Sequence, residues 1–391
     1  MLSINNADAL LKSYYLDAIT DQLNTATSPF YNMIKKGSED IVGKNVLCPI
    51  APRINHNVYM TSETDELPSV VDNTYLTLKA ELKNIYGKVE ISDKTLRASE
   101  RGSAALVNAL GVEMQSLLDS AKFHFERALM GTGTGILAKI KDLTASAPKY
   151  NVDTTARLHV GMAVKVYNRS GGAYVERSAS VFTIKAIDRE SGTVTLSSSV
   201  SNAAADDVLI LSGNFDKELN GVNYVFDNPA NSYFGVSTTA HPYLKGTKKT
   251  VATLTLDAIQ DAVDMSDIVS GRQPDLIMCS FDVRKKYRAL IASKGVNVDY
   301  LNLDGGFKAL SYNGIPVVAS KFIDEGEMMV LSTSDFKLCQ LNDWDWIQGG
   351  VGGSVLHQIP DKAAYSATLV KYANLICTRP AAQYKLTGIT A

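Results

Sequence analysis

The chain has 391 residues, of which 45% are hydrophobic and 20% are charged, and its formal net charge is -2. This length and apolar content suffice for two or three domains with separate cores, and they exclude an intrinsically disordered chain. The near-neutral charge lacks the basic excess that a dedicated nucleic-acid-binding protein needs.

Cysteine usage and the N-terminal sequence indicate the compartment. The four cysteines include no C-x-x-C pair, which predicts reduced thiols rather than a disulfide scaffold. Residues 1–8 have neither the basic start nor the apolar core of a secretory signal. No apolar run approaches the ~18 residues that a membrane-spanning helix needs. We therefore expect a cytoplasmic protein with no membrane partner.

Residues 1–73 contain a candidate helix and then an extended segment. Apolar residues recur at helical spacing near the start, which a capping helix would explain: Leu10, Leu11, Tyr14, Tyr15 and Ile19. From Val46 to Asn73 the chain is poor in helix formers, and its middle, Thr61–Pro68, is acidic. This pattern predicts a long hairpin that must lie on another surface, because it cannot bury its own backbone. A mobile surface loop is the alternative.

Residues 74–137 carry the strongest pattern. Apolar and polar residues alternate from Leu76 to Leu82, which predicts a half-buried strand, and the phase slips at Asn84–Ile85, which predicts a bulge. From Ser103 to Met130 the apolar period becomes helical, so we expect one helix on the order of 40 Å long at ~1.5 Å per residue. The glycine-rich turn Gly131–Gly135 ends it.

The remaining sequence predicts a β-rich module and then a mixed α/β region, so the chain is of the α+β class. Short β-rich runs separated by glycine and polar turns predict a barrel or sandwich at 141–215: 163–167, 181–187, 193–196 and 208–211. Further elements are expected as helices around Leu256–Val263 and at 281–291, and as strands at 275–279, 315–318, 328–331, 367–371 and 375–377. We expect the last two strands to lie beside the strand that begins near residue 76.

Two segments together resemble a known family. The first segment has a fixed order of elements: a strand, then Ile91–Leu96, a long helix and Gly-Thr-Gly-Thr-Gly. This order is similar to that of the peripheral domain and spine helix of tailed-bacteriophage major capsid proteins, which have the Hong Kong 97-type capsid fold. Tyr312–Ser320, which contains Gly-Ile-Pro-Val-Val, and then Glu325–Leu331 resemble the G-x-P-V-V segment and following strand of the family's axial domain. The resemblance covers roughly Arg53 to Leu386.

The resemblance implies an α+β, Hong Kong 97-like fold in five parts. These are an N-terminal arm (1–50), an extended β-hairpin loop (51–75), a peripheral domain with the spine helix (76–140 and 366–391), a β-barrel-like insertion domain (141–215) and a mixed α/β axial domain (216–365). The arm and the loop would lie across neighbouring subunits.

Charged residues in two places could meet between such subunits. The hairpin tip carries three carboxylates, and a basic stretch with interleaved acids precedes the long helix. A salt-sensitive contact between them is one hypothesis. A solvated face with local ion pairs is the other. The candidate inter-subunit residues are Glu63, Asp65, Glu66, Lys88, Lys94, Arg97 and Arg101.

No motif predicts catalysis, a cofactor or a metal. Gly131–Gly135 follows a helix instead of preceding one and lacks the G-x-G-x-x-G spacing, and Gly37–Lys44 misses the P-loop spacing. The histidines are isolated and never at metal-ligand spacing: His56, His124, His159, His241 and His357. We therefore expect neither an enzyme nor a cofactor-binding protein.

The resemblance implies a major capsid protein that self-assembles as hexamers and pentamers into an icosahedral shell around double-stranded DNA. Its partners would be other copies of itself, a scaffolding protein, a portal and a decoration protein. It would assemble in the host cytoplasm and reside in the virion. One alternative is an encapsulin-type bacterial nanocompartment shell. A hydrolytic enzyme with a β accessory module and a tail or adhesin protein are weaker alternatives.

Overall fold

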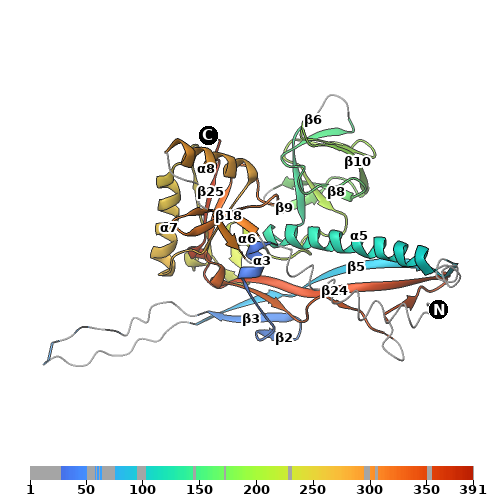
Figure 1. Cartoon of the computed structure of the whole chain (residues 1–391), viewed down its shortest axis with the longest axis horizontal. Helices are drawn as coiled ribbons and strands as arrows, with labels where there is room; N and C mark the ends of the chain where they lie inside the picture. The colour runs from blue at the N-terminus through green and yellow to red at the C-terminus, as the bar shows by residue number, and fades with distance from the viewer. Residues whose placement is uncertain are drawn as a thin grey trace.

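The computed structural model describes residues 28–50, 58, 60, 62–63, 75–94, 103–143, 147–170, 173–227, 231–294, 300–303, 307–349 and 355–390. The candidate helix around residues 10–19 lies outside them. Figure 1 shows an elongated molecule in which one long helix and two long strands run away from an α/β region, with a β-rich module above the helix.

A 14-residue strand, β24 (Ala364–Cys377), organises the central sheet. β5 (Lys83–Ser92) pairs with it antiparallel along its whole length, from Ser92 opposite Ala364 to Lys83 opposite Ala373. This confirms that the C-terminal strand returns beside the first long strand, although the sequence predicted two separate strands there. The other strands of this sheet are β1 (Lys35–Gly37), β21 (Phe336–Gln340), β22 (Asp345–Trp346) and β23 (His357–Gln358).

The alternating segment near residue 76 divides between two sheets. β4 (Leu76–Glu81) buries Leu78 and Ala80 and pairs with β3 (Asn45–Ile50), and these two strands form the base of the predicted hairpin. β2 (Ile41–Val42) pairs with the other edge of β3. The chain changes sheet at Leu82, whose N–H donates to the carbonyl of Lys44 at 3.1 Å. The phase slip predicted at Asn84–Ile85 therefore occurs slightly earlier, and it marks a change of sheet, not a bulge.

The long helix, α5, spans Ser103–Met130, as predicted. It lies along β5 and β24 (Figure 1) and buries Met114, Leu118, Phe125 and Leu129, whereas Asp119 is exposed. The apolar stripe of the helix therefore covers one face of the sheet.

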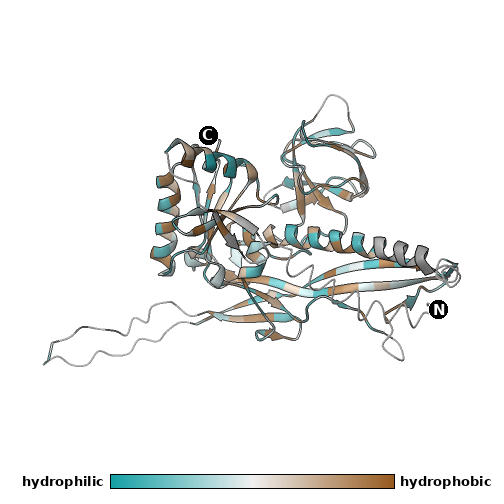
Figure 2. Cartoon of the chain, viewed as in Figure 1, coloured by the Kyte–Doolittle hydropathy of each residue, from teal (hydrophilic) through white to brown (hydrophobic). Residues whose placement is uncertain are grey.

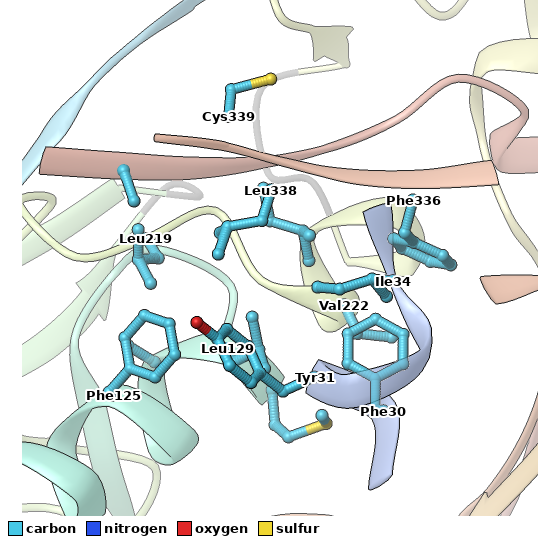
Figure 3. Close-up of a cluster of buried hydrophobic side chains, with 14 of the residues drawn as sticks. Phe30, Tyr31, Ile34, Phe125, Leu129, Leu219, Val222, Phe336, Leu338 and Cys339 are labelled. Atoms are coloured by element: carbon cyan, nitrogen blue, oxygen red, sulfur yellow. The ribbon is translucent and has the colours of Figure 1, made fainter. Parts of the chain in front are cut away.

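A short N-terminal helix, α3 (Pro29–Met33), completes the core beside the end of α5. The Ser28 side chain accepts from the Tyr31 N–H at 3.2 Å and caps the helix. Phe30 meets the ring of Phe336 edge-on at 5.2 Å, and Tyr31 meets Phe125 at 5.3 Å. Figure 3 shows these side chains converging from α3, α5 and β21, far apart in the sequence.

The predicted β-rich module is a seven-stranded sheet in the order β10-β11-β7-β6-β12-β8-β9, closed by pairing of β10 with β8. Its core is separate and contains Leu137, Val166, Ile184 and Leu209. The strands are β6 (Ile136–Leu143), β7 (Lys149–Val152), β8 (Ala163–Ser170), β9 (Ala173–Glu176), β10 (Phe182–Asp188), β11 (Thr193–Leu196) and β12 (Val208–Leu211). We call residues 136–213 the insertion module.

The α/β region is a second seven-stranded sheet, in the order β15-β25-β20-β16-β19-β18-β17. α7 (Leu256–Ser270) and α8 (Phe281–Ser293) pack in one apolar cluster with residues of this sheet such as Ile277 and Val317, whereas Met278 and Met329 belong to the core beneath α5. Its strands are β15 (Thr247–Thr250), β16 (Leu276–Cys279), β17 (Tyr300–Leu303), β18 (Phe307–Tyr312), β19 (Ile315–Ala319), β20 (Met328–Leu331) and β25 (Tyr384–Thr387).

Short elements link these parts. They are α6 (Val222–Phe226), β13 (Ser232–Tyr233), β14 (Val236–Ser237) and the 3₁₀ turns η3 (Pro242–Leu244), η4 (Thr333–Asp335) and η5 (Pro380–Ala382). Hydrophobic segments gather where α5, the sheets and α6 meet (Figure 2).

Strand pairing departs from three of the predicted boundaries. β25 lies between β15 and β20, so residues 384–387 belong to the sheet of the α/β region, whereas the predicted boundary put them with residues 366–391 in the peripheral domain. β21–β23 belong to the β24 sheet although they fall within 216–365. A division at 140/141 would cut β6. Local patterns indicate strands but not their partners, which explains these differences.

Candidate assembly surface

α5 and the β5–β24 sheet form the elongated part of the molecule, and α5 packs closely against the sheet. A Cβ atom at Gly87 in β5 would lie 2.9 Å from Cδ1 of Leu117 in α5. Glycine at this position therefore lets the helix approach the strand.

The C-terminal end of α5 is anchored in the α/β region. Nδ2 of Asn223 donates to the carbonyl of Met130 at 2.8 Å, which satisfies one of the free carbonyls at the helix end. Arg127 makes a two-pronged ion pair with Glu218, and its Nη1 lies 2.9 Å from Oε2. A Cβ at Gly221 would lie only 2.4 Å from the carbonyl oxygens of Ala128 and Leu129, so only glycine fits there.

The hairpin that starts at β3 and β4 presents apolar side chains to solvent. Val58 is 81% exposed and Met60 102% exposed. Of the predicted acidic tip, Glu63 is exposed, whereas Asp65 and Glu66 lie outside the described residues. The side chains of Val58 and Met60 are therefore accessible to another chain.

The basic stretch is only partly described. Nζ of Lys88 lies 2.6 Å from the carboxylate of Glu90 in the same strand. The hydrogen bond from Lys88 lowers the pKa of the Glu90 carboxyl. Lys94 is exposed, and Arg97 and Arg101 lie outside the described residues. Within the described part of the chain no ion pair joins Glu63 to either lysine. Lys88 therefore has a partner within its own strand, as the hypothesis of a solvated face with local ion pairs expects. A salt-sensitive contact between subunits stays a prediction.

Sequence analysis missed a more concentrated basic surface, on α8. Arg284, Lys285 and Arg288 are exposed, and no ion pair joins any of them to another described residue. Lys286, in contrast, pairs with Asp282 at 3.7 Å. The signal was the run Arg284–Arg288, which contains four cations and no acid.

The neighbouring helix, α7, has the opposite charge and no basic residue. Asp257, Asp261 and Asp264 are exposed on it, and they are followed by exposed Met265 and Ile268. Asp261 pairs with Lys249 of β15 at 3.0 Å. Two faces of opposite sign thus lie on one domain.

A polar cavity of about 400 Å³ lies where α5, the insertion module and the α/β region meet. Its carboxylates already have cations: Asp324 has Arg157 at 2.6 Å and Glu327 has Lys385 at 2.8 Å. Burial raises the pKa of Glu327. These ion pairs join the insertion module and the strands of the α/β region across the cavity.

No other chemistry is indicated in the described part of the chain. No group of three histidine, cysteine or acidic side chains there could hold a metal ion. None of the described helices is long and apolar enough to cross a membrane.

Sequence comparison and structure comparison give different results. No family model and no curated protein sequence matches the chain. In structure, the chain is similar to the capsid subunit of cyanophage A-1(L), with a TM-score of 0.54 and 12% identity over 93% of each chain. The capsid of an empty GTA particle (TM-score 0.49, 10% identity, 93% and 90% covered) and the SrpI encapsulin of Synechococcus elongatus PCC 7942 (0.46, 10%, 93% and 89%) are also similar.

The likeness to the cyanophage capsid chain extends over 93% of each of the two chains. The chain therefore has the fold of a phage capsid subunit, the Hong Kong 97-type capsid fold.

Proposed function

We propose that this chain is a tailed-phage major capsid protein, which assembles as hexamers and pentamers into an icosahedral shell around double-stranded DNA. The observation that supports it is the fold, which matches a cyanophage capsid subunit over 93% of both chains. The role is structural, and its mechanism is geometric: each subunit spreads over its neighbours.

The shape of the subunit favours this role. The chain exposes 20002 Å² of surface. A compact monomer of its mass, 42.3 kDa, would expose roughly 15,000 Å². Burial of an exposed apolar side chain such as Met60 by another chain stabilises the assembly by roughly 1.5–3 kcal/mol. Such a subunit becomes well packed only in an assembly.

The same proposal includes the surroundings of the shell. A scaffolding protein and a portal would act in assembly, and a decoration protein would bind the insertion module. A net charge of -2 suits a wall that encloses DNA without sequence-specific binding. We place the protein in the virion, after assembly in the host cytoplasm.

Negative-stain electron microscopy and sedimentation of the purified protein, with and without a scaffold, test the proposal. We expect closed particles, or capsomers that become shells when a scaffold is added. DNase-protected double-stranded DNA inside particles from infected cells would support a phage capsid, and protein cargo would indicate an encapsulin-type compartment. A compact monomer or dimer under every condition would overturn the proposal.

The hairpin gives a first mutational test. We expect deletion of Met60 to Val70 to leave a folded subunit that no longer forms shells, because the deletion removes the surface laid on the neighbour. Sedimentation velocity measures the assembly, and circular dichroism checks the fold. A Gly/Ser replacement of equal length is the control for loop length, and it should fail in the same way. Normal shells from the deletion variant would show that the hairpin is not an assembly element.

A further inference from the structure

Two exposed helix faces on the α/β region have complementary charge and spacing. On α7, the residues at the centre of the exposed face follow the spacing 4, 3, 4: Asp257, Asp261, Asp264 and Ile268. On α8 the exposed face follows the same spacing: Phe281, Lys285, Arg288 and Ala292. Residues at this spacing form one stripe along a helix, which is the pattern of helix–helix contacts.

The order of apolar and charged residues along the two stripes favours antiparallel pairing of the helices. If Phe281 is placed on Ile268, then Lys285 meets Asp264, and Arg288 meets Asp261. Both stripes extend about 10.5 Å between the first and third of these positions, at ~1.5 Å per residue. In the parallel match Phe281 would instead meet Asp257, which would desolvate a carboxylate against an aromatic ring.

These groups are accessible at the surface, although Asp261 also pairs with Lys249 at 3.0 Å and the Arg284 guanidinium lies 5.3 Å from the Phe281 ring centre. Ile268 is 72% exposed and Phe281 is 47% exposed, which is unusual for side chains of this size. Within the described residues Lys285 and Arg288 have no ion pair, and Asp264 only accepts a hydrogen bond from Gln260, at 2.6 Å.

The two faces cannot meet within one chain. Both helices pack by their buried sides in the same apolar cluster as the seven-stranded sheet, so the stripes point away from the protein. In Figure 1, α7 lies along the left border of the α/β region and α8 along its upper border. A second copy must therefore supply the complementary face.

We propose that α8 of one subunit docks antiparallel on α7 of the next, with Phe281 on Ile268, Lys285 on Asp264 and Arg288 on Asp261. The contact is heterologous, because different faces meet, and repetition of such a contact closes into a ring when the rotation allows it. The inference rests on the proposed function for the size of the ring, but not for the contact itself.

Disulfide cross-linking tests the contact in assembled particles. The cysteines of the native chain are all buried, so background reaction is low: Cys48, Cys279, Cys339 and Cys377. We expect the Ile268→Cys/Phe281→Cys double variant, oxidised in particles, to run on denaturing gels as a ladder that ends at the pentamer and the hexamer. A mixture of the two single variants should give dimers only, and Asp257→Cys/Phe281→Cys, the parallel match, should give none.

The outcomes separate this inference from the proposed function. Particles without cross-links would overturn the contact and leave the shell intact, and dimers alone from the double variant would indicate a symmetric contact instead. If no particles form from the wild-type chain, the proposed function fails. Particles in which the parallel pair cross-links would overturn the antiparallel register.

Charge exchange tests the same contact without new cysteines. We expect Lys285→Glu and Asp264→Lys each to slow shell assembly at least tenfold at low salt, and the double exchange to restore it, since the pair is again complementary. Lys185→Glu, an exposed lysine of the insertion module, changes the net charge equally and should assemble normally. A double variant as slow as the single variants would contradict a direct pair.

Discussion

At the scale of single residues, two ionisable side chains on α5 respond to pH in opposite directions. Burial lowers the pKa of His124 to about 4, with the Arg127 charge adding to the effect. Burial raises the pKa of Glu126 to about 7, although Lys122 and Lys321 oppose the rise. Between pH 4.5 and 6.5, Glu126 is protonated to a greater extent in the folded state than in the unfolded state. His124 is protonated to a lesser extent in the folded state.

We therefore expect the two contributions to offset each other in wild-type protein. The Glu126 contribution to the free energy of unfolding is largest at low pH and is lost as the pH rises to about 7, whereas the His124 contribution grows over nearly the same interval. The Glu126→Gln variant keeps only the second contribution. Its stability should rise from pH 4.5 to 6.5 and exceed that of wild type above pH 7, by at most about 3 kcal/mol.

Urea unfolding followed by tryptophan fluorescence measures this effect, because Trp344 and Trp346 are both buried in the core that includes Phe125. Glu113→Gln, which alters an exposed carboxylate on the same helix, is the matched control. Equal pH slopes for wild type and Glu126→Gln would contradict the assignment.

The two tryptophans both lie in the core: Trp344 is 3% and Trp346 2% exposed. Lys371 of β24 lies among them, 2.6 Å from Asp343, and burial lowers its pKa.

At the scale of elements, the insertion module is held against the α/β region by a side chain. Nη2 of Arg157 lies 2.6 Å from the Asp324 carboxylate and 2.7 Å from the carbonyl oxygen of Phe322. The Phe123 ring of α5 adds edge contacts to His159 and Phe322 at 4.5 Å and 5.3 Å. Charged hydrogen bonds of this kind contribute about 1.5–3 kcal/mol.

We expect Arg157→Ala to loosen this docking without unfolding either part. Hydrogen exchange measured by mass spectrometry should become faster in residues 320–327 and in the facing turn at 153–160, because the ion pair restrains both. Arg189→Ala is the control for residues 320–327, since within the described residues the Arg189 side chain donates to the carbonyls of Thr155 and Leu158 inside the module. Unchanged exchange at 320–327 would show that aromatic packing alone holds the parts together.

Local patterns predicted the elements far better than their neighbours. α5 was predicted at about Ser103 to Met130, and the strands near 163, 193 and 208 were found, because their periodicity is strong. β6 and β7 were missed, since they pair with β12 and β11, which come later in the module, and β9 was missed because Val175 and Glu176 are exposed and give no apolar pattern. β25, buried at three successive positions, carries no alternation that could identify its partners.

The candidate contact residues fared similarly. The acidic hairpin tip and the basic stretch were identified from charge alone, but charge cannot show that Lys88 is already paired along its strand. The α8 run was overlooked because only the fold separates exposed Arg284 and Arg288 from buried Tyr287.

At the scale of the whole molecule, the insertion module is an independent unit spliced into the chain. It has its own apolar core, and its two ends meet: a Cβ at Gly135 would lie 2.9 Å from the carbonyl oxygen of Asn214. Removing the module would therefore leave two ends that a direct bond can join.

We expect a chain that lacks residues 136–213, with Gly135 joined to Asn214, to fold and unfold cooperatively. Its free energy of unfolding should fall by about 1.5–3 kcal/mol, because the Arg157 contacts are lost. Circular dichroism during urea unfolding measures this, and the excised module expressed alone is the companion experiment. An aggregated remainder together with an unfolded module would show that the two cores depend on each other.

β24 has a consequence for synthesis on the ribosome. β5 and α5 form the elongated part of the molecule only with β24 (Ala364–Cys377), which emerges more than 200 residues after Met130. The insertion module, in contrast, pairs strands that are close in sequence, and local contacts form fast. The insertion module of the nascent chain should thus fold while the apolar stripe of α5 is still exposed to solvent. During that interval the nascent chain is a substrate for chaperones.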